Sequence, residues 1–370
     1  MSDPTTHPIT PLPYQPAYEA LEDDEAETER ALNETLYEIN ETVRKDEGHA
    51  YRSVHAKSHG LLFGELQVAA GLPEMLAQGV FATPASYPVV MRLSTVPGDL
   101  LEDSVSTPRG LGLKIVGVPG ERLPGSEEDV TQDLLMVNGP VFSAPTAKKF
   151  LGTLKLLAAS TDKAPGLKKA LSATLRGLES LIEKAGGESG TLKALGGHPA
   201  TNILGETFYT QVPMRFGPYM GKLQLVPVSP ELTALTDAPV DLGERPNALR
   251  DAVVAHFGVH GGTWELRVQL CTDLEKMPIE DASVQWPEDL SPYLTVARIV
   301  ARPQVAWSAA RSAAVDDGMS FSPWHGLAAH RPIGSVMRVR KAVYAMASRY
   351  RSEHNATQVE EPRALSALPD

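Results

Sequence analysis

The stretch YRSVHAK, residues 51–57, is the most informative part of this chain. It places His55 three positions after Arg52, among small and β-branched residues that favour an extended strand. A lone histidine is usually an ordinary core or surface residue. Because an arginine accompanies this one on the predicted strand, we interpret the stretch as part of a cofactor site.

Two segments further along the chain carry polar residues in a similar setting. PVVMRLSTV, residues 88–96, places Arg92 and Ser94 on a predicted strand. DLLMVNGPVF, residues 133–142, places Asn138 at the end of another. Polar side chains are unusual within such apolar runs, so both segments are candidates for the same site.

A predicted helix near the end of the chain carries RKAVY, with Arg340 and Tyr344 four positions apart. At about 100° per residue, Ser348 and Arg351 fall on the same stripe. The neighbouring stripe is apolar and contains Val336, Val339, Val343, Met346 and Tyr350. The remaining face, which includes Arg338 and Arg349, is expected to face water.

In this order the four segments resemble the heme site of the catalase superfamily, and the resemblance covers about residues 52–351. MRLSTV, TPRG at residues 107–110 and Trp286-Pro287 resemble further motifs of that family. The chain is most similar to its small bacterial members, the mini-catalase-like heme peroxidases. The fold implied is α+β: an antiparallel, catalase-like heme-binding β-barrel with helical insertions and a C-terminal helix.

Within this barrel we expect strands in residues 50–142, 207–228, 263–272 and 294–301, and helices over 146–160 and 166–184. An N-terminal arm and an acidic helix starting at Ala17 would occupy residues 1–47. The heme-binding domain would span 48–355, and a flexible tail 356–370.

The resemblance implies Tyr344 as the ligand of the iron of heme b, where Arg340 one turn away would favour the phenolate. His55 would be the acid-base group on the opposite heme face. Ser94 would orient its imidazole, and Asn138 would hydrogen-bond the peroxide.

The resemblance also implies how the rest of the heme is held. Arg52, Arg92 and Arg351 would pair with its propionates, because planar guanidinium groups match carboxylates. Val54 would lie beside the heme next to His55.

Several residues depart from the catalase pattern. Catalases have two adjacent asparagines where this chain has Val137 and Asn138, and an ungapped alignment would put Val137 at the catalytic position; we nevertheless choose Asn138. Thr107 replaces an acidic channel residue, and Ser143 replaces a phenylalanine. These changes predict a roomier or differently polar approach to the iron.

The predicted function is therefore a heme peroxidase that reduces hydrogen peroxide or organic hydroperoxides with a small organic reductant, with weak catalase activity. One alternative is a fatty-acid hydroperoxide isomerase similar to the coral allene oxide synthases. Their threonine before the distal histidine is Val54 here, which favours the peroxidase. The other alternative is a non-catalytic heme-binding protein.

Composition limits what else the chain does. A formal net charge of -12 argues against nucleic-acid binding. Cys271 is the single cysteine, which excludes an intramolecular disulfide and a multi-cysteine metal cluster. His198, His256, His260, His325 and His330 show no metal-ligand spacing. No secretory signal or membrane-spanning run is evident, so we expect a cytoplasmic protein, with a homo-oligomer left open.

Overall fold

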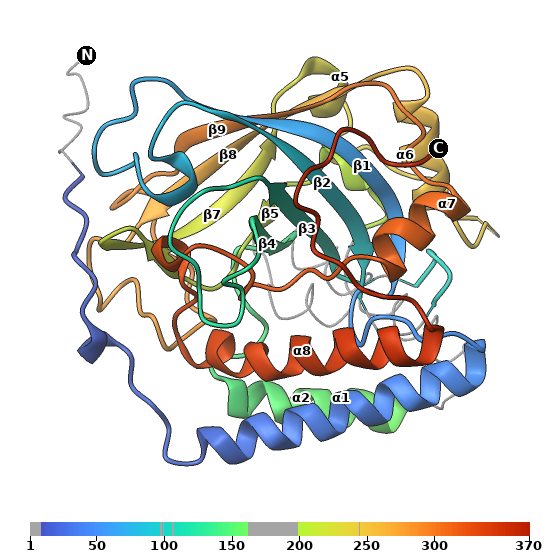
Figure 1. Cartoon of the computed structure of the whole chain (residues 1–370), viewed down its shortest axis with the longest axis horizontal. Helices are drawn as coiled ribbons and strands as arrows, with labels where there is room; N and C mark the ends of the chain where they lie inside the picture. Colours follow the sequence, from blue (N-terminus) through green and yellow to red (C-terminus); the bar gives the residue numbers. More distant parts are fainter. Residues whose placement is uncertain (1–8, 97, 99, 106, 162–198, 244) are drawn as a thin grey trace, which may run out of the picture.

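The strands form one antiparallel sheet that closes into a barrel (Figure 1). The computed structural model describes residues 9–96, 98, 100–105, 107–161, 199–243 and 245–370. Among these, the strand order is β5-β4-β3-β2-β1-β9-β8-β7-β6, and pairing of β5 with β7 closes a ring of eight strands with β6 outside it. The antiparallel barrel predicted from the sequence is confirmed. The strands are β1 Lys57–Val68, β2 Ser86–Thr95, β3 Arg109–Val116, β4 Thr131–Val137, β5 Phe208–Tyr209, β6 Met214–Phe216, β7 Tyr219–Pro227, β8 Gly262–Leu270 and β9 Leu294–Ala301.

The barrel interior is the main hydrophobic core. Successive side chains of a strand point to opposite faces of the sheet. Leu111 and Leu113 of β3 and Met136 of β4 belong to the large core cluster. The residues between them, such as Gly112 and Leu135, therefore face outward. This alternation leaves the outer face of β2 to β4 available for a site.

Three long helices pack against one another outside the barrel: α1 Glu25–Glu47, α2 Ala147–Thr161 and α8 Ser335–Asn355 (Figure 1). Their common core contains Leu32 and Leu36 of α1 and Val339 and Val343 of α8. The shorter segments are α5 Pro230–Thr233, α6 Ala248–Phe257, α7 Ala309–Ser312, the π-helical η4 Ala313–Asp317, and the 3-10 turns η1 Pro16–Tyr18, η2 Gly79–Phe81, η3 Ile203–Gly205 and η5 Ala328–His330. None of the helices in the described ranges is both long and apolar enough to cross a membrane.

Helix α1 begins later than predicted. We expected it from Ala17, but Pro16–Tyr18 forms a 3-10 turn and the helix begins at Glu25. The carboxylate of Glu19, between the two, is held by Arg331 at 2.7 Å and by the backbone N–H of Gly334 at 3.1 Å. These tertiary contacts hold the connecting segment in an extended form.

Helix α8 confirms the predicted apolar stripe, because Val336, Val339, Val343 and Tyr350 are buried. The prediction for Arg338 was wrong. Its guanidinium does not face water but bonds Glu19 of the N-terminal segment, Glu25 of α1 and Glu280 of a loop. These carboxylates come from distant parts of the chain, so the helical period alone could not reveal them.

The segment 356–370, predicted as a flexible tail, lies along the barrel. Leu365 and Leu368 pack in a cluster with Leu61 and Phe321, and Arg311 Nε donates to the carbonyl oxygen of Pro369 at 2.7 Å. The helix predicted over 166–184 and the first eight residues of the predicted arm lie outside the described residues.

Candidate functional site

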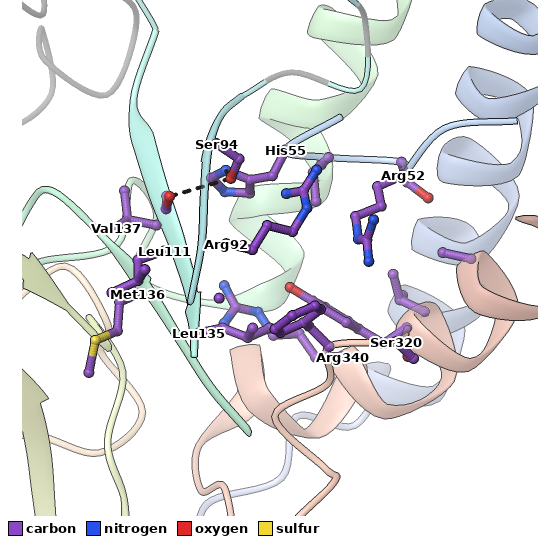
Figure 2. A pocket seen from close by; sticks show the side chains of 18 of the residues that line it. Arg52, His55, Arg92, Ser94, Leu111, Leu135, Met136, Val137, Ser320 and Arg340 are labelled. Atoms are coloured by element: carbon purple, nitrogen blue, oxygen red, sulfur yellow. Dashed lines mark hydrogen bonds between the residues drawn. The ribbon is translucent and has the colours of Figure 1, made fainter. Parts of the chain in front are cut away.

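A pocket lies between the outer face of strands β2 to β4 and helix α8 (Figure 2). Its empty space is about 870 Å³ including the part open to solvent. Side chains from both ends of the chain meet there. The predicted site residues in its lining are Arg52, Val54, His55, Arg92, Ser94, Arg340, Tyr344 and Arg351.

The strand register arranges the pocket wall in two rows of paired residues. They are Ser94, Gly110 and Val137 in the first row, and Arg92, Gly112 and Leu135 in the second. A Cβ on Gly110 would lie 2.4 Å from ring atoms of His55, and one on Gly112 would lie 2.9 Å from Cδ1 of Phe321. Glycine therefore lets two rings lie directly against the backbone of β3.

His55 belongs to the loop before β1, which begins at Lys57, and its φ is 56°. The predicted strand setting is wrong for this residue. A left-handed backbone is uncommon for residues other than glycine and is costly, so it persists only where its surroundings enforce it. Here it accompanies an imidazole that lies against Gly110 beside Ser94 (Figure 2).

Ser94 lies beside the imidazole of His55. Its Oγ lies 3.3 Å from His55 Nδ1 and 3.4 Å from the carbonyl oxygen of Gly110. When the hydroxyl proton is donated to that carbonyl, Oγ accepts from Nδ1–H. This tautomer leaves Nε2 with the free electron pair that a proton acceptor needs.

The environment of His55 keeps it neutral. Burial is the main cause, and the nearby charges of Arg92 and Arg340 add to it, so that the pKa of His55 is lowered to about 3. At neutral pH the imidazole is therefore uncharged, with one ring nitrogen carrying a free electron pair.

The structure does not bring Asn138 to the pocket. Strand β4 ends at Val137, which lines the pocket, and Asn138 follows it. The Asn138 amide accepts from the backbone N–H of Arg109 at 2.9 Å and donates to Glu206 at 2.6 Å. Glu206 also pairs with the Arg109 guanidinium. The alternation of side chains along β4 thus places Val137, the residue that an ungapped alignment selects, on the pocket side.

Helix α8 presents its predicted polar stripe to the pocket, because Arg340, Tyr344, Ser348 and Arg351 all line it. Tyr344 is half-buried. The guanidinium of Arg340 lies 5.2 Å from the centre of the Phe142 ring. The stripe therefore faces the wall that carries His55.

Three arginines gather around Asp316; Arg92 and Arg351 are buried, and Arg52 is partly exposed. Arg92 Nε lies 2.6 Å from Asp316 Oδ1, and Arg52 NH1 lies 3.5 Å from it. Arg52 and Arg351 both donate to the carbonyl oxygen of Asp316 at 2.6 Å. Burial and the neighbouring arginines lower the pKa of Arg52 well below its usual value and that of Arg351 to about 10.

These residues fit the heme that the sequence resemblance implies. Arg52, Arg92 and Arg351 outnumber the nearby carboxylates of Asp316 and Asp317, and this excess of positive charge suits propionates. Arg351 Nε is buried without a hydrogen-bond partner among the described residues, so it can serve a carboxylate. Tyr344 lines the same pocket and offers an oxygen ligand.

Solved structures of catalases share this architecture. A fungal catalase aligns with a TM-score of 0.58 at 19% identity, over 87% of this chain and 68% of its own. A bacterial catalase aligns with a TM-score of 0.56 at 16% identity, over 94% of this chain and 64% of its own. Catalase A from Saccharomyces cerevisiae also aligns with a TM-score of 0.56 at 16% identity, over 98% of this chain and 77% of its own.

The chain has the catalase fold. It spans roughly two thirds to three quarters of the length of these catalases. No protein-family model and no curated protein sequence matches it. At this level of identity the likeness to catalases concerns the fold, and the activity is argued below from the pocket.

Sequence reasoning missed three contributors to the pocket. Asp316 has no local signal, since its partner Arg92 lies 224 positions away. Phe321 lies in an irregular segment before α8. Gly112 had a usable signal, because the alternating glycines of GLG at residues 110–112 indicate a strand face without side chains.

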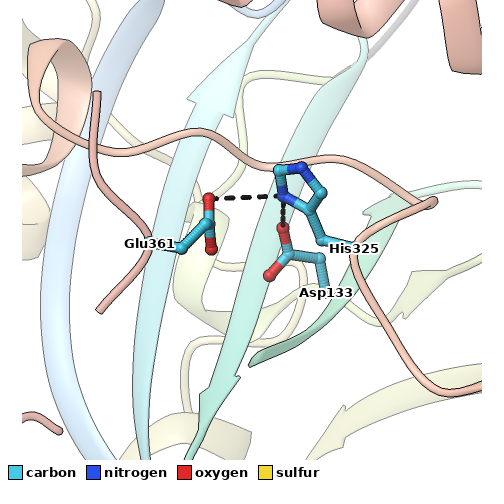
Figure 3. Close-up of side chains that lie close together, drawn as sticks. All are labelled: Asp133, His325 and Glu361. Carbon is cyan, nitrogen blue, oxygen red and sulfur yellow. Dashed lines mark ion pairs between the residues drawn. The ribbon is translucent and has the colours of Figure 1, made fainter. Parts of the chain in front are cut away.

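A second cluster of charged side chains lies further along the same strands (Figure 3). Lys114 Nζ lies 2.7 Å from Asp133 and 2.5 Å from Glu361 of the tail. His325 Nδ1 lies 3.5 Å and 3.2 Å from the same carboxylates. Burial opposes the charge of His325, but the two carboxylates outweigh it and raise its pKa to about 9. Lys114 and His325 thus carry two positive charges opposite two carboxylates. The ion pairs to Glu361 attach the tail to the barrel.

Proposed function

We propose that this protein is a heme peroxidase, which reduces hydrogen peroxide or an organic hydroperoxide at the expense of a small organic reductant and has weak catalase activity. The observation that carries the proposal is a neutral His55 on one wall of a pocket whose other wall carries Tyr344, with three arginines beside them. The catalase fold is consistent with peroxide chemistry.

Each pocket residue has a part in holding the heme. Tyr344 would ligate the iron through its phenolate oxygen, with Arg340 one turn away. Arg52, Arg92 and Arg351 would bind the propionates, and Val54 would contact the ring. Bound heme supplies the redox-active iron at which the peroxide O–O bond is cleaved.

His55 would move the proton. Its free Nε2 takes the proton of the incoming peroxide and returns it to the departing oxygen, which leaves as water or as an alcohol. Ser94 holds the ring through Nδ1, so the same nitrogen serves both steps. Proton transfer of this kind contributes about 10²- to 10⁴-fold to the rate.

The ligand assignment is tested by Tyr344→Phe in protein reconstituted with heme. Loss of most bound heme, or loss of the phenolate charge-transfer band, is expected. Tyr350→Phe is a matched control on the same helix, because Tyr350 bonds Glu41 and Arg44 and does not line the pocket. An unchanged spectrum in Tyr344→Phe would remove the ligand.

Stopped-flow mixing of the parent with hydrogen peroxide, an alkyl hydroperoxide and a fatty-acid hydroperoxide then tests the reaction. Turnover that requires a phenolic reductant supports the peroxidase. Rearrangement of the fatty-acid hydroperoxide without a reductant would favour the isomerase, and no reaction would leave a heme-binding protein.

A further inference from the structure

The charged cluster that holds the tail also brings together ligand atoms for a metal ion (Figure 3). His325 Nδ1, one oxygen of Asp133 and one oxygen of Glu361 all lie within 4.8 Å of one another. Imidazole and carboxylate groups are ligands that zinc accepts in proteins. The three residues come from strand β4, a loop before α8 and the tail, so no local spacing in the sequence could reveal the set.

The distances within the cluster suit a shared cation better than hydrogen bonds. His325 Nδ1 lies 3.2 Å from Glu361 Oε1 and 3.5 Å from Asp133 Oδ2. Nδ1 and Oε1 are both buried, and neither makes a hydrogen bond to any residue in the described part of the chain. A zinc ion with bonds of about 2.0 to 2.2 Å, at tetrahedral or octahedral angles, separates its ligand atoms by about 2.8 to 3.6 Å. Both contacts fall within this range.

Lys114 binds mainly to the other oxygens of the two carboxylates. Its ammonium lies 2.7 Å from Asp133 Oδ1 and 2.5 Å from Glu361 Oε2, and a cation would compete only with its longer contact to Asp133 Oδ2, at 3.0 Å. The backbone N–H of Ser322 donates to Asp133 Oδ2, and the Thr131 hydroxyl donates to Glu361 Oε2, both at 2.9 Å. Contacts of this kind orient the ligands of a metal site.

The charges of the cluster admit a divalent ion. Two carboxylates balance it when the imidazole is neutral, and Lys114 then adds one positive charge. Asp129 and Arg122 also act on the cluster, and their charges offset each other. Because the ion takes the place of the proton on His325, the net charge of the cluster rises by one.

We propose that Asp133, His325 and Glu361 bind a divalent transition-metal ion of the zinc class. The imidazole favours such an ion over calcium or magnesium, which prefer oxygen ligands. The bound ion joins strand β4 and the tail to the loop that follows Phe321, and three protein ligands leave a position for water. Binding at this site does not depend on heme, so its outcome is separate from that of the proposed peroxidase.

Calorimetric titration of the full chain with zinc chloride, after removal of metal with EDTA, tests the site. The parent should bind one ion in the cluster and release a proton, so the heat should depend on the buffer. Glu361→Gln and His325→Gln should each weaken binding by about 100-fold or more, since the loss of an outer-shell contact alone costs about 10- to 100-fold. Unchanged affinity in both variants would overturn the proposal.

The matched control combines His256→Gln with His260→Gln. These two rings lie 5.5 Å apart where α6 ends, and two neighbouring imidazoles offer zinc a competing surface site. The double variant should keep the ion in the cluster. Binding that is lost in this variant and kept in His325→Gln would overturn the proposal.

The parent gives a second measurement, which does not depend on whether the variants fold. Anomalous scattering from a zinc-soaked crystal of the parent should place an ion between His325 Nδ1 and the two carboxylates. Zinc should also raise the melting temperature of the parent more than that of Glu361→Gln. A folded parent that binds no zinc, or that binds it only elsewhere, would overturn the proposal.

Discussion

Asp316 Oδ1 lies 2.6 Å from Nε of Arg92, in a buried position between two further arginines. The same carboxylate accepts hydrogen bonds from Ser58 at 2.7 Å and Ser312 at 2.8 Å. Burial opposes its charge, but Arg92 and Arg52 outweigh burial and lower the pKa of Asp316. The carboxylate therefore partly neutralises the arginines that we assign to the propionates.

Asp316→Asn should lower the free energy of unfolding of the heme-free protein by about 3 kcal/mol, because it removes one partner of a buried ion pair. Heme should then raise the melting temperature more in the variant than in the parent, since one carboxylate fewer neutralises the arginines that the propionates meet. Thermal denaturation with and without hemin measures both effects. Ser312→Ala removes a hydrogen bond to the same carboxylate but no charge, and should cost about 1 kcal/mol. A heme-induced shift equal to that of the parent would contradict the assignment.

Gly110→Ala should displace the His55 ring, because the new Cβ would lie 2.4 Å from two of its atoms. We expect heme binding to persist and peroxide cleavage to slow by about 10²-fold or more, as for loss of the acid-base group. Stopped-flow rates of the single variant, of His55→Ala and of the double variant test this. If Gly110 acts through His55, adding Gly110→Ala to His55→Ala changes nothing further; additive losses would show that Gly110 has another role.

Local patterns in the sequence were enough to predict the elements that hold the site. Strand β2 and helix α8 could be predicted because apolar side chains repeat in them with periods of two and 3.6 residues. The polar stripe of α8 was predicted from the same period. The left-handed backbone of His55 has no such pattern. It accompanies the contact of the His55 ring with Gly110, which only the folded barrel creates.

The choice between Val137 and Asn138 shows a second limit. Adjacent residues of a strand face opposite sides of the sheet. An error of one position therefore assigns the pocket to a residue whose side chain points to the other face. The composition of the segment did not fix this register, whereas the pairing of Val137 with Gly110 does. Asp316 shows a third limit, because a contact across 224 positions leaves no trace in local sequence.

Acid should destabilise the protein partly through His330. The ring packs against both Phe81 and Phe216, and its Nε2 accepts from the backbone N–H of Val80 at 3.0 Å. Burial lowers the pKa of His330 from 6.5 to about 4. Between these values the unfolded chain binds more protons than the folded one, so this contribution is complete above pH 6.5 and is lost as the pH falls toward 4.

His330→Gln should therefore flatten the acid limb of the stability curve. For each proton that the chain takes up on unfolding, the free energy of unfolding changes by about 1.4 kcal/mol per pH unit. The variant should take up one proton fewer, so its slope should be smaller by about this amount. Urea denaturation at pH 7 and pH 5 measures the difference. A slope equal to that of the parent would show that His330 is not the group that titrates.

The tail contact through Glu361 gives the opposite dependence on pH. His325 has its pKa raised from 6.5 to about 9, so its contribution to stability is complete below pH 6.5 and is lost as the pH rises through 9. The cluster also supports the pocket, since Asp133 accepts from the backbone N–H of Ser322 at 2.9 Å, next to Phe321 in the pocket wall.

Glu361→Gln should lower the free energy of unfolding at pH 7 by about 3 kcal/mol, because it leaves Lys114 and His325 with the single carboxylate of Asp133. It should also move the alkaline loss of stability to lower pH, since His325 loses one of the charges that raise its pKa. Denaturant titrations between pH 6 and 10 measure both effects. Arg363→Ala is the matched control in the same tail, because Arg363 is exposed and its pairing with Glu128 is worth at most about 1 kcal/mol. If the two variants lose the same stability with the same pH profile, the buried cluster does not hold the tail.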